Sequence, residues 1–276
     1  MEICTIASGS SGNAMLVSCG GSRVLLDAGI SARRITTALR ELGVAPGELD
    51  AVLITHEHSD HIAGLATLSK QLRLPVYASA ATARQLCCRI PFLEELVRPV
   101  EPDAGFQLGA LWARAFATPH DAAGSVGYTL EDGACRMALA TDLGHLTQAV
   151  WQAVLGADLV VAECNHDEDW VRSGPYPYYL KQRILGDRGH LCNEAGAELA
   201  ARAVERGARA VLLAHLSTEN NTPVRALDTV SRRLSAAGVE EGDVHVSVAP
   251  RSQPGPVFRL ERDGLAVMER REAVVC

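Results

Sequence analysis

The sequence lacks the features that mark membrane-spanning, exported and nucleic-acid-coating proteins. No run of about 18 apolar residues occurs, and this excludes a transmembrane helix of ordinary length. The opening residues, MEICTIASGSSGN, contain neither a basic segment nor a long apolar one, so we expect no signal peptide. A formal net charge of −7 excludes a strongly basic protein that coats nucleic acid nonspecifically. We therefore expect a cytoplasmic protein without a membrane partner.

Aromatic residues are also scarce, at 4% of the 276 residues, although 47% are hydrophobic. Aliphatic side chains must therefore fill the core, which a chain of this length can make large. The eight cysteines form no CxxC pair and no disulfide-framework spacing. We expect most of them, including Cys276, to be small buried hydrophobes in a reducing compartment.

Short apolar runs alternate with amphipathic segments, and this pattern predicts an α/β architecture. The expected strands are residues 3–7, 14–18, 23–27, 51–55, 74–78, 137–140, 159–162, 210–214, 244–248, 257–260 and 265–268. The expected helices run from the cap Ser31 to Gly43, from His61 to Leu72, from the cap Asn193 to about Arg206, and from Thr222 to near Gly238.

The segment HEHSDH, residues 56–61, directly follows a predicted buried strand. In extended backbone His56 and His58 project to the same side and can share one metal ion. Asp60 and His61 lie where the chain turns into a helix, so they can face a second ion. Imidazole nitrogens with a minority of carboxylate oxygens suit Zn²⁺, and also Mn²⁺ or Fe. A surface loop that happens to be rich in histidine is the less probable alternative.

Three further candidate ligands, His120, Asp142 and His215, each follow an apolar strand-like run. The ends of strands are where sheets of this kind present functional residues. Taken singly, a His or Asp at such a position is more often structural or solvated than a ligand. As a set, they supply what a pair of metal ions still needs.

The motif HxHxDH, followed in order by a His, an Asp and a last His, resembles the signature of the metallo-β-lactamase superfamily. Four further segments resemble its YycJ-type (WalJ) branch: SGSSGN, AECNHD, LKQRILGDRGHLCNE and AHLSTENN. Cys164 and Cys192 stand where that branch has serines. The resemblance implies an αββα sandwich of two mixed β-sheets with helices outside. It also implies a single domain over residues 1–276 with no β-CASP insertion.

The resemblance further implies a set of roles around two divalent metal ions. His56, His58 and His120 would hold the first ion, Asp60, His61 and His215 the second, and Asp142 would bridge them. Asp27 matches an early structural Asp behind the metal site. Proteins of the branch are regarded as 5′-to-3′ DNA exonucleases, so a phosphodiesterase acting on single-stranded DNA or on a 5′ end is the expected activity. Two such ions activate water and neutralise charge on a phosphate, while Asp60 and Asp142 would act as catalytic residues.

Residues 172–193 contain four basic side chains, one acidic side chain and three of the five tyrosines. Basic groups interleaved with aromatic rings suit single-stranded nucleic acid. Lys181, Arg183 and Tyr178 are therefore expected to bind substrate. An amphipathic helix with a polar face is the alternative.

Two histidines and one turn complete the candidate site. His190 and His166 could protonate a leaving oxygen or bind phosphate, although satisfied surface or core histidines are as plausible. Ser10, Ser11 and Asn13 lie in a turn whose N–H groups and short side chains could cradle a phosphate. A tight β-turn would explain those three residues equally well.

Three functions fit these residues. The leading hypothesis is a two-metal DNA exonuclease. Another hydrolase of the same fold could instead act on RNA ends, a cyclic nucleotide, or a small ester or thioester, because metal ligands alone do not distinguish these substrates. A metal-bound regulatory protein without turnover predicts a broken ligand set, whereas all seven positions are filled here. The native metal and the oligomeric state are not encoded in these motifs.

Overall fold

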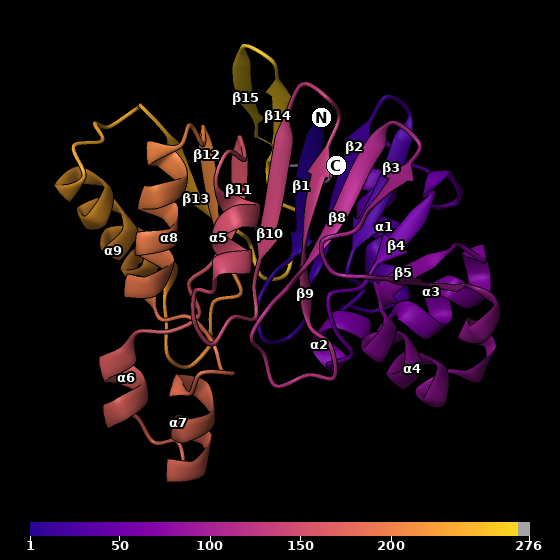
Figure 1. The fold of residues 1–276 in the computed structure, drawn as a ribbon, viewed down its shortest axis with the longest axis horizontal. Coiled ribbons are helices and arrows are strands. Elements are labelled where there is room, and N and C mark those ends of the chain that lie inside the picture. The colour runs from indigo at the N-terminus through magenta and orange to yellow at the C-terminus, as the bar shows by residue number, and fades with distance from the viewer. Residues whose placement is uncertain (270–276) are drawn as a thin grey trace, which may run out of the picture.

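A computed structural model describes residues 1–269, so the expectation for Cys276 lies outside the described part. Two β-sheets face each other, and helices cover both outer sides (Figure 1). This is the αββα sandwich of two mixed sheets that the sequence analysis predicts. None of the helices within residues 1–269 combines the length and apolarity needed to cross a bilayer.

The first sheet runs in the order β15-β14-β1-β2-β3-β4-β5-β6. Its strands are β1 (Glu2–Ala7), β2 (Ala14–Cys19), β3 (Ser22–Leu26), β4 (Ala51–Leu53), β5 (Val76–Ser79), β6 (Val97–Val100), β14 (Val257–Glu261) and β15 (Gly264–Met268). The pairs from β15 to β3 are antiparallel, and those from β3 to β6 are parallel.

The second sheet runs in the order β13-β12-β11-β10-β9-β8-β7. Its strands are β7 (Gly105–Leu108), β8 (Leu111–Ala117), β9 (Val126–Glu131), β10 (Arg136–Ala140), β11 (Leu159–Glu163), β12 (Ala210–Ala214) and β13 (His245–Val248). Strands β10 to β13 are parallel neighbours. The carboxyl ends of β10, β11 and β12 therefore lie side by side at one edge of the sandwich.

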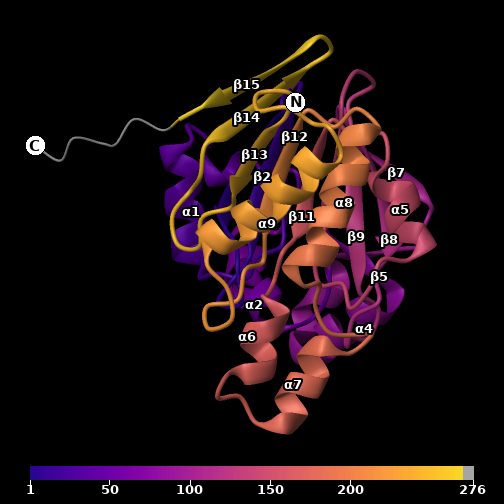
Figure 2. The same cartoon turned by 90° about the vertical axis from the view of Figure 1, so that its left-hand side faces the viewer.

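The helices divide between the two outer faces. The first sheet is covered by α1 (Ala32–Glu41), α2 (Ser59–Ile62), α3 (Leu65–Leu72), α4 (Ala80–Arg89) and the short 3₁₀ helices η1 (Pro46–Glu48) and η2 (Pro91–Glu95). The second sheet is covered by α5 (Gln148–Val154), α8 (Asn193–Glu205) and α9 (Pro223–Ala236). Two more helices, α6 (Glu168–Ser173) and α7 (Tyr178–Leu185), project from the sandwich (Figures 1 and 2). We call residues 168–185 the arm.

Aliphatic side chains fill the core between the two sheets, as the scarcity of aromatic residues predicts. Ile3, Val17 and Leu53 from the first sheet meet Leu139 from the second. Tyr128 is the large exception, and it is completely buried with its hydroxyl donating to the carbonyl of Ile54 at 3.0 Å. Burial raises the pKa of this phenol well above its ordinary value. The sandwich is thus a rigid support for the loops at its edge.

Two helix predictions need correction. The expected helix over 61–72 is divided into α2 and α3 around Gly64, because a Cβ there would lie 2.2 Å from the Ile30 carbonyl oxygen. The cap of α8 is Cys192 rather than Asn193. The Asn193 amide is instead buried against Asn221, with hydrogen bonds of 3.1 and 2.8 Å.

Strand β4 is also shorter than expected, since it ends at Leu53 and not at Thr55. The prediction that most cysteines are buried is wrong for the described residues: Cys4, Cys135 and Cys164 are buried, Cys19, Cys87 and Cys192 are partly exposed, and Cys88 is exposed on α4.

Candidate active site

The carboxyl ends of the strands bring the predicted ligands together at one edge of the sandwich. His56 and His58 follow β4, His120 follows β8, Asp142 follows β10 and His215 follows β12. Asp60 and His61 lie on α2, next to the turn of residues 8–13. We call this set of seven residues the cluster: His56, His58, Asp60, His61, His120, Asp142 and His215.

Close backbone packing places α2 against the opening turn. The carbonyl oxygen of Asp60 accepts a hydrogen bond of 2.8 Å from the Asn13 amide. A Cβ on Gly29 would lie only 1.6 Å from that oxygen, so this approach requires glycine. The Asn13 side chain closes its own turn on Gly9 and lies 3.1 Å from His61 Nε2. Asn13 therefore joins the opening turn to the cluster, at the same ring nitrogen of His61 that faces Asp60 and Asp142.

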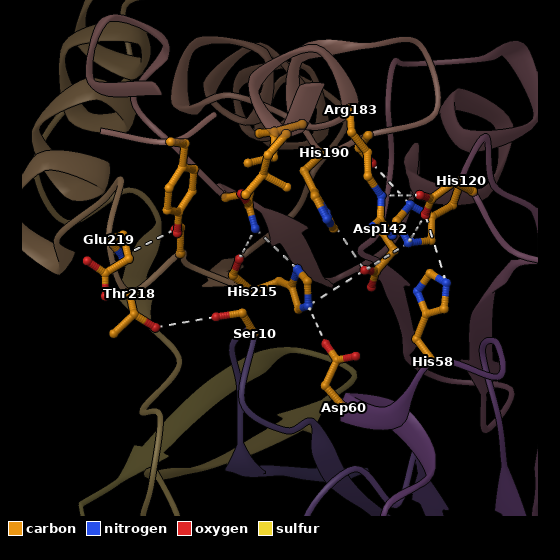
Figure 3. A pocket seen from close by; sticks show the side chains of 17 residues that line it. Ser10, His58, Asp60, His120, Asp142, Arg183, His190, His215, Thr218 and Glu219 are labelled. Carbon is orange, nitrogen blue, oxygen red and sulfur yellow. Dashed lines mark hydrogen bonds and ion pairs between the residues drawn. The ribbon is translucent and has the colours of Figure 1, made fainter. Parts of the chain in front are cut away.

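Asp142 occupies the centre of the cluster (Figure 3). Its Oδ1 lies 3.7 Å from His120 Nε2 and 3.6 Å from His215 Nε2, and its Oδ2 lies 3.6 Å from His61 Nε2. Asp60 Oδ2 is 3.5 Å from both His61 Nε2 and His215 Nε2. These separations are too long for good hydrogen bonds. They match the roughly 3.4 Å that separates two ligands bound at about 2.1 Å to one tetrahedral ion.

Three of the five histidines in the cluster are held through Nδ1, the ring nitrogen that does not face Asp142. His61 Nδ1 lies 2.8 Å from Asp27 Oδ2, and His215 Nδ1 lies 3.1 Å from Glu163 Oε1. His120 Nδ1 donates to the carbonyl of Gly189 at 3.0 Å. A partner of this kind fixes the tautomer and orientation of a metal-binding imidazole. Asp27 thus lies where the resemblance places it, behind the cluster.

Burial and mutual charge shift the protonation of the cluster. Burial lowers the pKa of His61, but the carboxylates of Asp142 and Asp27 raise it to about 10. Burial lowers the pKa of His56 well below its ordinary value, and the neighbouring His61 adds to this effect. Burial raises the pKa of Asp60, yet the neighbouring imidazoles of His215 and His61 outweigh burial and hold this pKa below the usual range. The cluster is thus a buried set of strongly coupled anions and cations.

The donor atoms of the cluster fit a pair of divalent metal ions. Asp142 Oδ2 is buried and has no hydrogen-bond partner among the described residues, although an unpartnered buried carboxylate oxygen is costly. Ligand-capable atoms converge within 4.8 Å in the groups His56–His58–His120, His56–His61–Asp142 and Asp60–His61–His215. Nitrogen-rich sites with carboxylate oxygens suit Zn²⁺, Mn²⁺ or Fe. These residues are therefore suited to binding metal ions.

Backbone strain coincides with the same residues. Asp27, Asp142 and His215 adopt φ values of 59°, 60° and 58°, in a left-handed region that non-glycine residues rarely use. Strain of this kind persists where the surrounding structure fixes it, and it gathers at functional sites. Glu163 accepts a hydrogen bond of 2.8 Å from the Leu143 amide, and Ser8 accepts one of 2.9 Å from the His215 amide.

A cavity of about 350 Å³ opens beside the cluster and lies under the arm. The arm lines it with Leu180, Arg183 and Ile184 of α7 and with Tyr176, which precedes that helix. On the opposite side the cavity is lined by residues of the opening turn and of the segment after His215 (Figure 3). These residues are Ser10, Ser217, Thr218 and Glu219.

Only some of the predicted substrate-binding residues line the cavity. Ser10 and Arg183 line it, whereas Ser11, Lys181 and Tyr178 do not. Tyr178 is 76% exposed, and Lys181 Nζ donates to the Arg172 carbonyl within the arm at 2.7 Å. None of these three side chains lines the cavity, nor does Asn13, so the cavity gives no support to their predicted role in binding substrate.

The two candidate acid histidines also have different positions. His190 lines the cavity, and its Nδ1 lies 2.8 Å from Glu163 Oε1. His166 is 1% exposed and lies outside the cavity, where its backbone bridges Cys192. Burial lowers the pKa of His166 to about 4. A neutral, enclosed imidazole fits the alternative of a satisfied core histidine better than a proton donor to a leaving group.

Sequence reasoning missed Glu163, a completely buried carboxylate shared by His190 and His215. Burial raises its pKa, but the charge and hydrogen bond of His190 bring the pKa down to about 2. Glu163 ends β11, so the strand-end rule that found Asp142 could also have found it.

Two more carboxylates next to the ligands were missed. Asp121 Oδ1 lies 3.3 Å from His120 Nε2, while its Oδ2 accepts a hydrogen bond of 2.5 Å from Arg183 Nε. Glu57 is buried and accepts a hydrogen bond of 2.8 Å from the Ala123 amide, which fixes the loop that carries His120. Both could have been found from the sequence, because each directly follows a predicted ligand: Glu57 follows His56, and Asp121 follows His120.

Comparison with known proteins agrees with this geometry. The profile of the beta-lactamase superfamily domain matches residues 22–216. The chain belongs to the metallo-β-lactamase superfamily. Within the superfamily, it is 34% identical over 246 residues to exodeoxyribonuclease YycJ of Bacillus anthracis, covering 88% of this chain and 92% of that protein. It is 35% identical over 242 residues to exodeoxyribonuclease WalJ of Streptococcus pneumoniae, covering 86% and 89%.

Solved structures of superfamily members share the fold. The metallo-β-lactamase fold protein YhfI of Bacillus subtilis matches with a TM-score of 0.67 and 19% identity, over 92% of this chain and 98% of that one. The short form of human tRNase Z matches with a TM-score of 0.64 and 17% identity, over 92% and 98%. At these identities the likeness establishes the architecture and leaves the substrate open.

Proposed function

We propose that this protein is a metal-dependent nuclease that degrades DNA from a 5′ end. The buried Asp142 carboxylate between two sets of histidine nitrogens carries this proposal, because it suits a pair of divalent ions. The exodeoxyribonuclease names of two relatives at 34% and 35% identity support the substrate class.

His56, His58 and His120 would hold one ion, Asp60, His61 and His215 the other, and Asp142 would contact both. Bound there, the ions would supply Lewis-acid polarisation of a phosphate and a nucleophile from water at neutral pH. Asp27, Glu163 and the Gly189 carbonyl hold the imidazoles in one orientation, so little reorganisation is needed during reaction.

Arg183 would bind a phosphate of the strand. Its Nε donates to Asp121 and its side chain lines the cavity, so the terminal guanidinium nitrogens would be available to a phosphate there. The hydrogen bond to Arg183 also lowers the pKa of Asp121 against the effect of burial, so the pair stays charged. Anchoring through Nε pre-organises the guanidinium without occupying its fork.

His190 is the candidate proton donor to the leaving oxygen. It lines the cavity, and Glu163 holds its Nδ1 at 2.8 Å. An imidazole oriented by a buried carboxylate is a common form of general acid. We also place the protein in the cytoplasm, which the free thiols of Cys135, Cys164 and Cys192 favour.

A direct assay tests this function. The protein, incubated with Mn²⁺ or Zn²⁺ and 5′-labelled single-stranded DNA, is expected to release short labelled products. The Asp142→Ala variant should lose this release while keeping its fold by circular dichroism. Intact DNA beside rapid turnover of an RNA end, a cyclic nucleotide or a thioester would contradict the proposal.

A further inference from the structure

The part of the cavity lined by the arm, Ser10 and Thr218, which we call the half-cavity, has a chemistry of its own. Tyr176, Leu180 and Ile184 present an aromatic ring and two aliphatic side chains from the arm. Opposite them, the hydroxyls of Ser10 and Thr218 lie 3.3 Å apart. None of these five side chains belongs to the cluster.

The apolar side of this half-cavity is not explained by core packing. Helix α7 has no fully buried residue, so it adds no side chain to the hydrophobic core. Leu180 and Ile184 are four residues apart, which places them on one face of the helix above the cavity. Tyr178 and Tyr179 leave the same helix toward solvent, with 76% and 74% exposure. The arm therefore presents one apolar face to the polar site and the remaining faces to water.

The size of the cavity limits what can enter it. Its 350 Å³ lies near the lower end of ordinary small-molecule sites, which span roughly 300–1,000 Å³. Such a space accommodates a single nucleotide and is far too small for a base pair with its two backbones. Arg183 lies on the arm between the apolar side chains and Asp121, where it can contact the phosphate of the same nucleotide.

We propose that this half-cavity is a subsite for the terminal nucleoside of a single strand, and this proposal rests on the proposed function. The base packs on Tyr176 with Leu180 and Ile184 beside it, because aromatic and aliphatic surfaces accept any base. The hydroxyls of Ser10 and Thr218 can donate or accept, so they tolerate all four base edges or a sugar hydroxyl. A terminal base that is paired must then separate from its partner before it enters, and each turnover releases a mononucleotide.

The test pairs a protein change with a matched substrate change. Single-stranded oligonucleotides carry either a normal or an abasic nucleotide at the 5′ end, and kcat/KM is measured for the wild type and for Tyr176→Ala. Stacking of one base on an aromatic ring predicts a loss of about ten-fold for the wild type on the abasic end. Tyr176→Ala should lose about the same factor on the normal end and nothing more on the abasic end.

Two variants control for folding and for general effects on the arm. Tyr176→Phe keeps the ring and should match the wild type on both substrates. Tyr178→Ala removes a tyrosine that points to solvent and should also match it. Equal losses of kcat/KM for Tyr176→Ala on normal and abasic ends would overturn the subsite, because the contribution of the Tyr176 ring would then not depend on a base.

The outcomes also separate this subsite from the function it rests on. If the wild type degrades both oligonucleotides at the same rate, the nuclease stands and the subsite is overturned. If the wild type releases nothing from either DNA, both proposals are overturned. Products longer than one nucleotide would likewise contradict a subsite that encloses the terminal nucleoside.

Discussion

The cluster and the arm face each other across one cavity, yet they are built in opposite ways. In the cluster, His56, His61 and Asp142 are almost completely buried, and side chains such as Asp27 and Glu163 hold the imidazoles from behind. The arm leaves the sandwich and has no fully buried residue in α7 (Figure 2).

This difference assigns a separate task to each region. The position of the cluster is set by strands β4, β8, β10 and β12, whose ends cannot move without disturbing the core. Helix α7 of the arm can change sequence at little cost in stability, because none of its side chains is fully buried. We infer that the cluster determines the chemistry and that the arm determines the substrate. The predictions below test this division, in order of decreasing expected effect.

The largest effect concerns protonation of the buried region beneath the arm. Burial lowers the pKa of His166 to about 4, against 6.5 for the free side chain. As pH falls, the imidazole takes up a proton in the unfolded chain first, because its pKa is higher there. The free energy of unfolding therefore falls between pH 6.5 and 4, and the full contribution of His166 to stability is present above pH 6.5. The loss at pH 4 amounts to about 3 kcal/mol.

Urea unfolding of the wild type and of His166→Gln, each at pH 7 and at pH 4.5, measures how much free energy of unfolding the protonation of His166 removes. The fall in unfolding free energy should be smaller in the variant, because only the wild type has this buried imidazole. Equal falls in both proteins would show that the His166 ring is accessible to protons in the folded state.

The second prediction concerns Glu163, the shared partner of His215 and His190. Glu163→Gln keeps the size of the side chain but removes the charge that orients both rings. Loss of a partner behind a metal ligand costs about 10- to 100-fold in metal affinity or activity. Metal content and kcat/KM of protein purified without chelator measure this loss. Unchanged metal content and activity would contradict the role assigned to this carboxylate.

The third prediction concerns the ion pair that connects the arm to the cluster. Arg183→Ala should raise KM for DNA by about ten-fold and reduce the salt slope of binding by about one, since one phosphate contact is lost. Asp121→Asn should raise KM in the same direction by leaving Arg183 without its anchor. Lys181→Ala is the matched control and should leave KM unchanged, because Lys181 lies outside the cavity. If Lys181→Ala raised KM as much as Arg183→Ala, DNA would be bound by a diffuse basic surface of the arm and not by Arg183 in the cavity.

The smallest effect is expected at the exposed side of the arm. Tyr179 is 74% exposed, so Tyr179→Ala should change the free energy of unfolding by less than about 0.5 kcal/mol. Thermal melting of both proteins checks this value. A loss of several degrees would show that the arm packs on a further surface.

The ligands could be predicted from sequence because their positions follow from simple rules. His120, Asp142 and His215 each follow an apolar strand, and parallel strands end at one edge of a sheet. The motif of residues 56–61 supplies the rest. The fold likewise follows from the alternation of strands and helices and from the resemblance, whereas the single-domain organisation stays a prediction.

The substrate side could not be predicted, because composition does not fix the rotation of a helix. Tyr176 and Arg183 line the cavity, while Tyr178 and Lys181, a few residues away, do not. Choosing among them requires knowing which side of α7 faces the sandwich, and eight residues without a fully buried side chain give too weak a hydrophobic period to show it. The burial of His166 just after β11 was likewise not encoded in its motif.

The division of tasks is tested most directly by comparing two substrates in two variants. Single-stranded DNA offers bases and a backbone, whereas a small phosphodiester of two abasic deoxyriboses offers the phosphodiester without a base. We expect Glu163→Gln to lower kcat/KM for both substrates by about 10- to 100-fold. We expect Tyr176→Ala to lower it about ten-fold for DNA and to leave the small diester unchanged. Parallel losses on both substrates in Tyr176→Ala, or full activity on either substrate in Glu163→Gln, would contradict the division between cluster and arm.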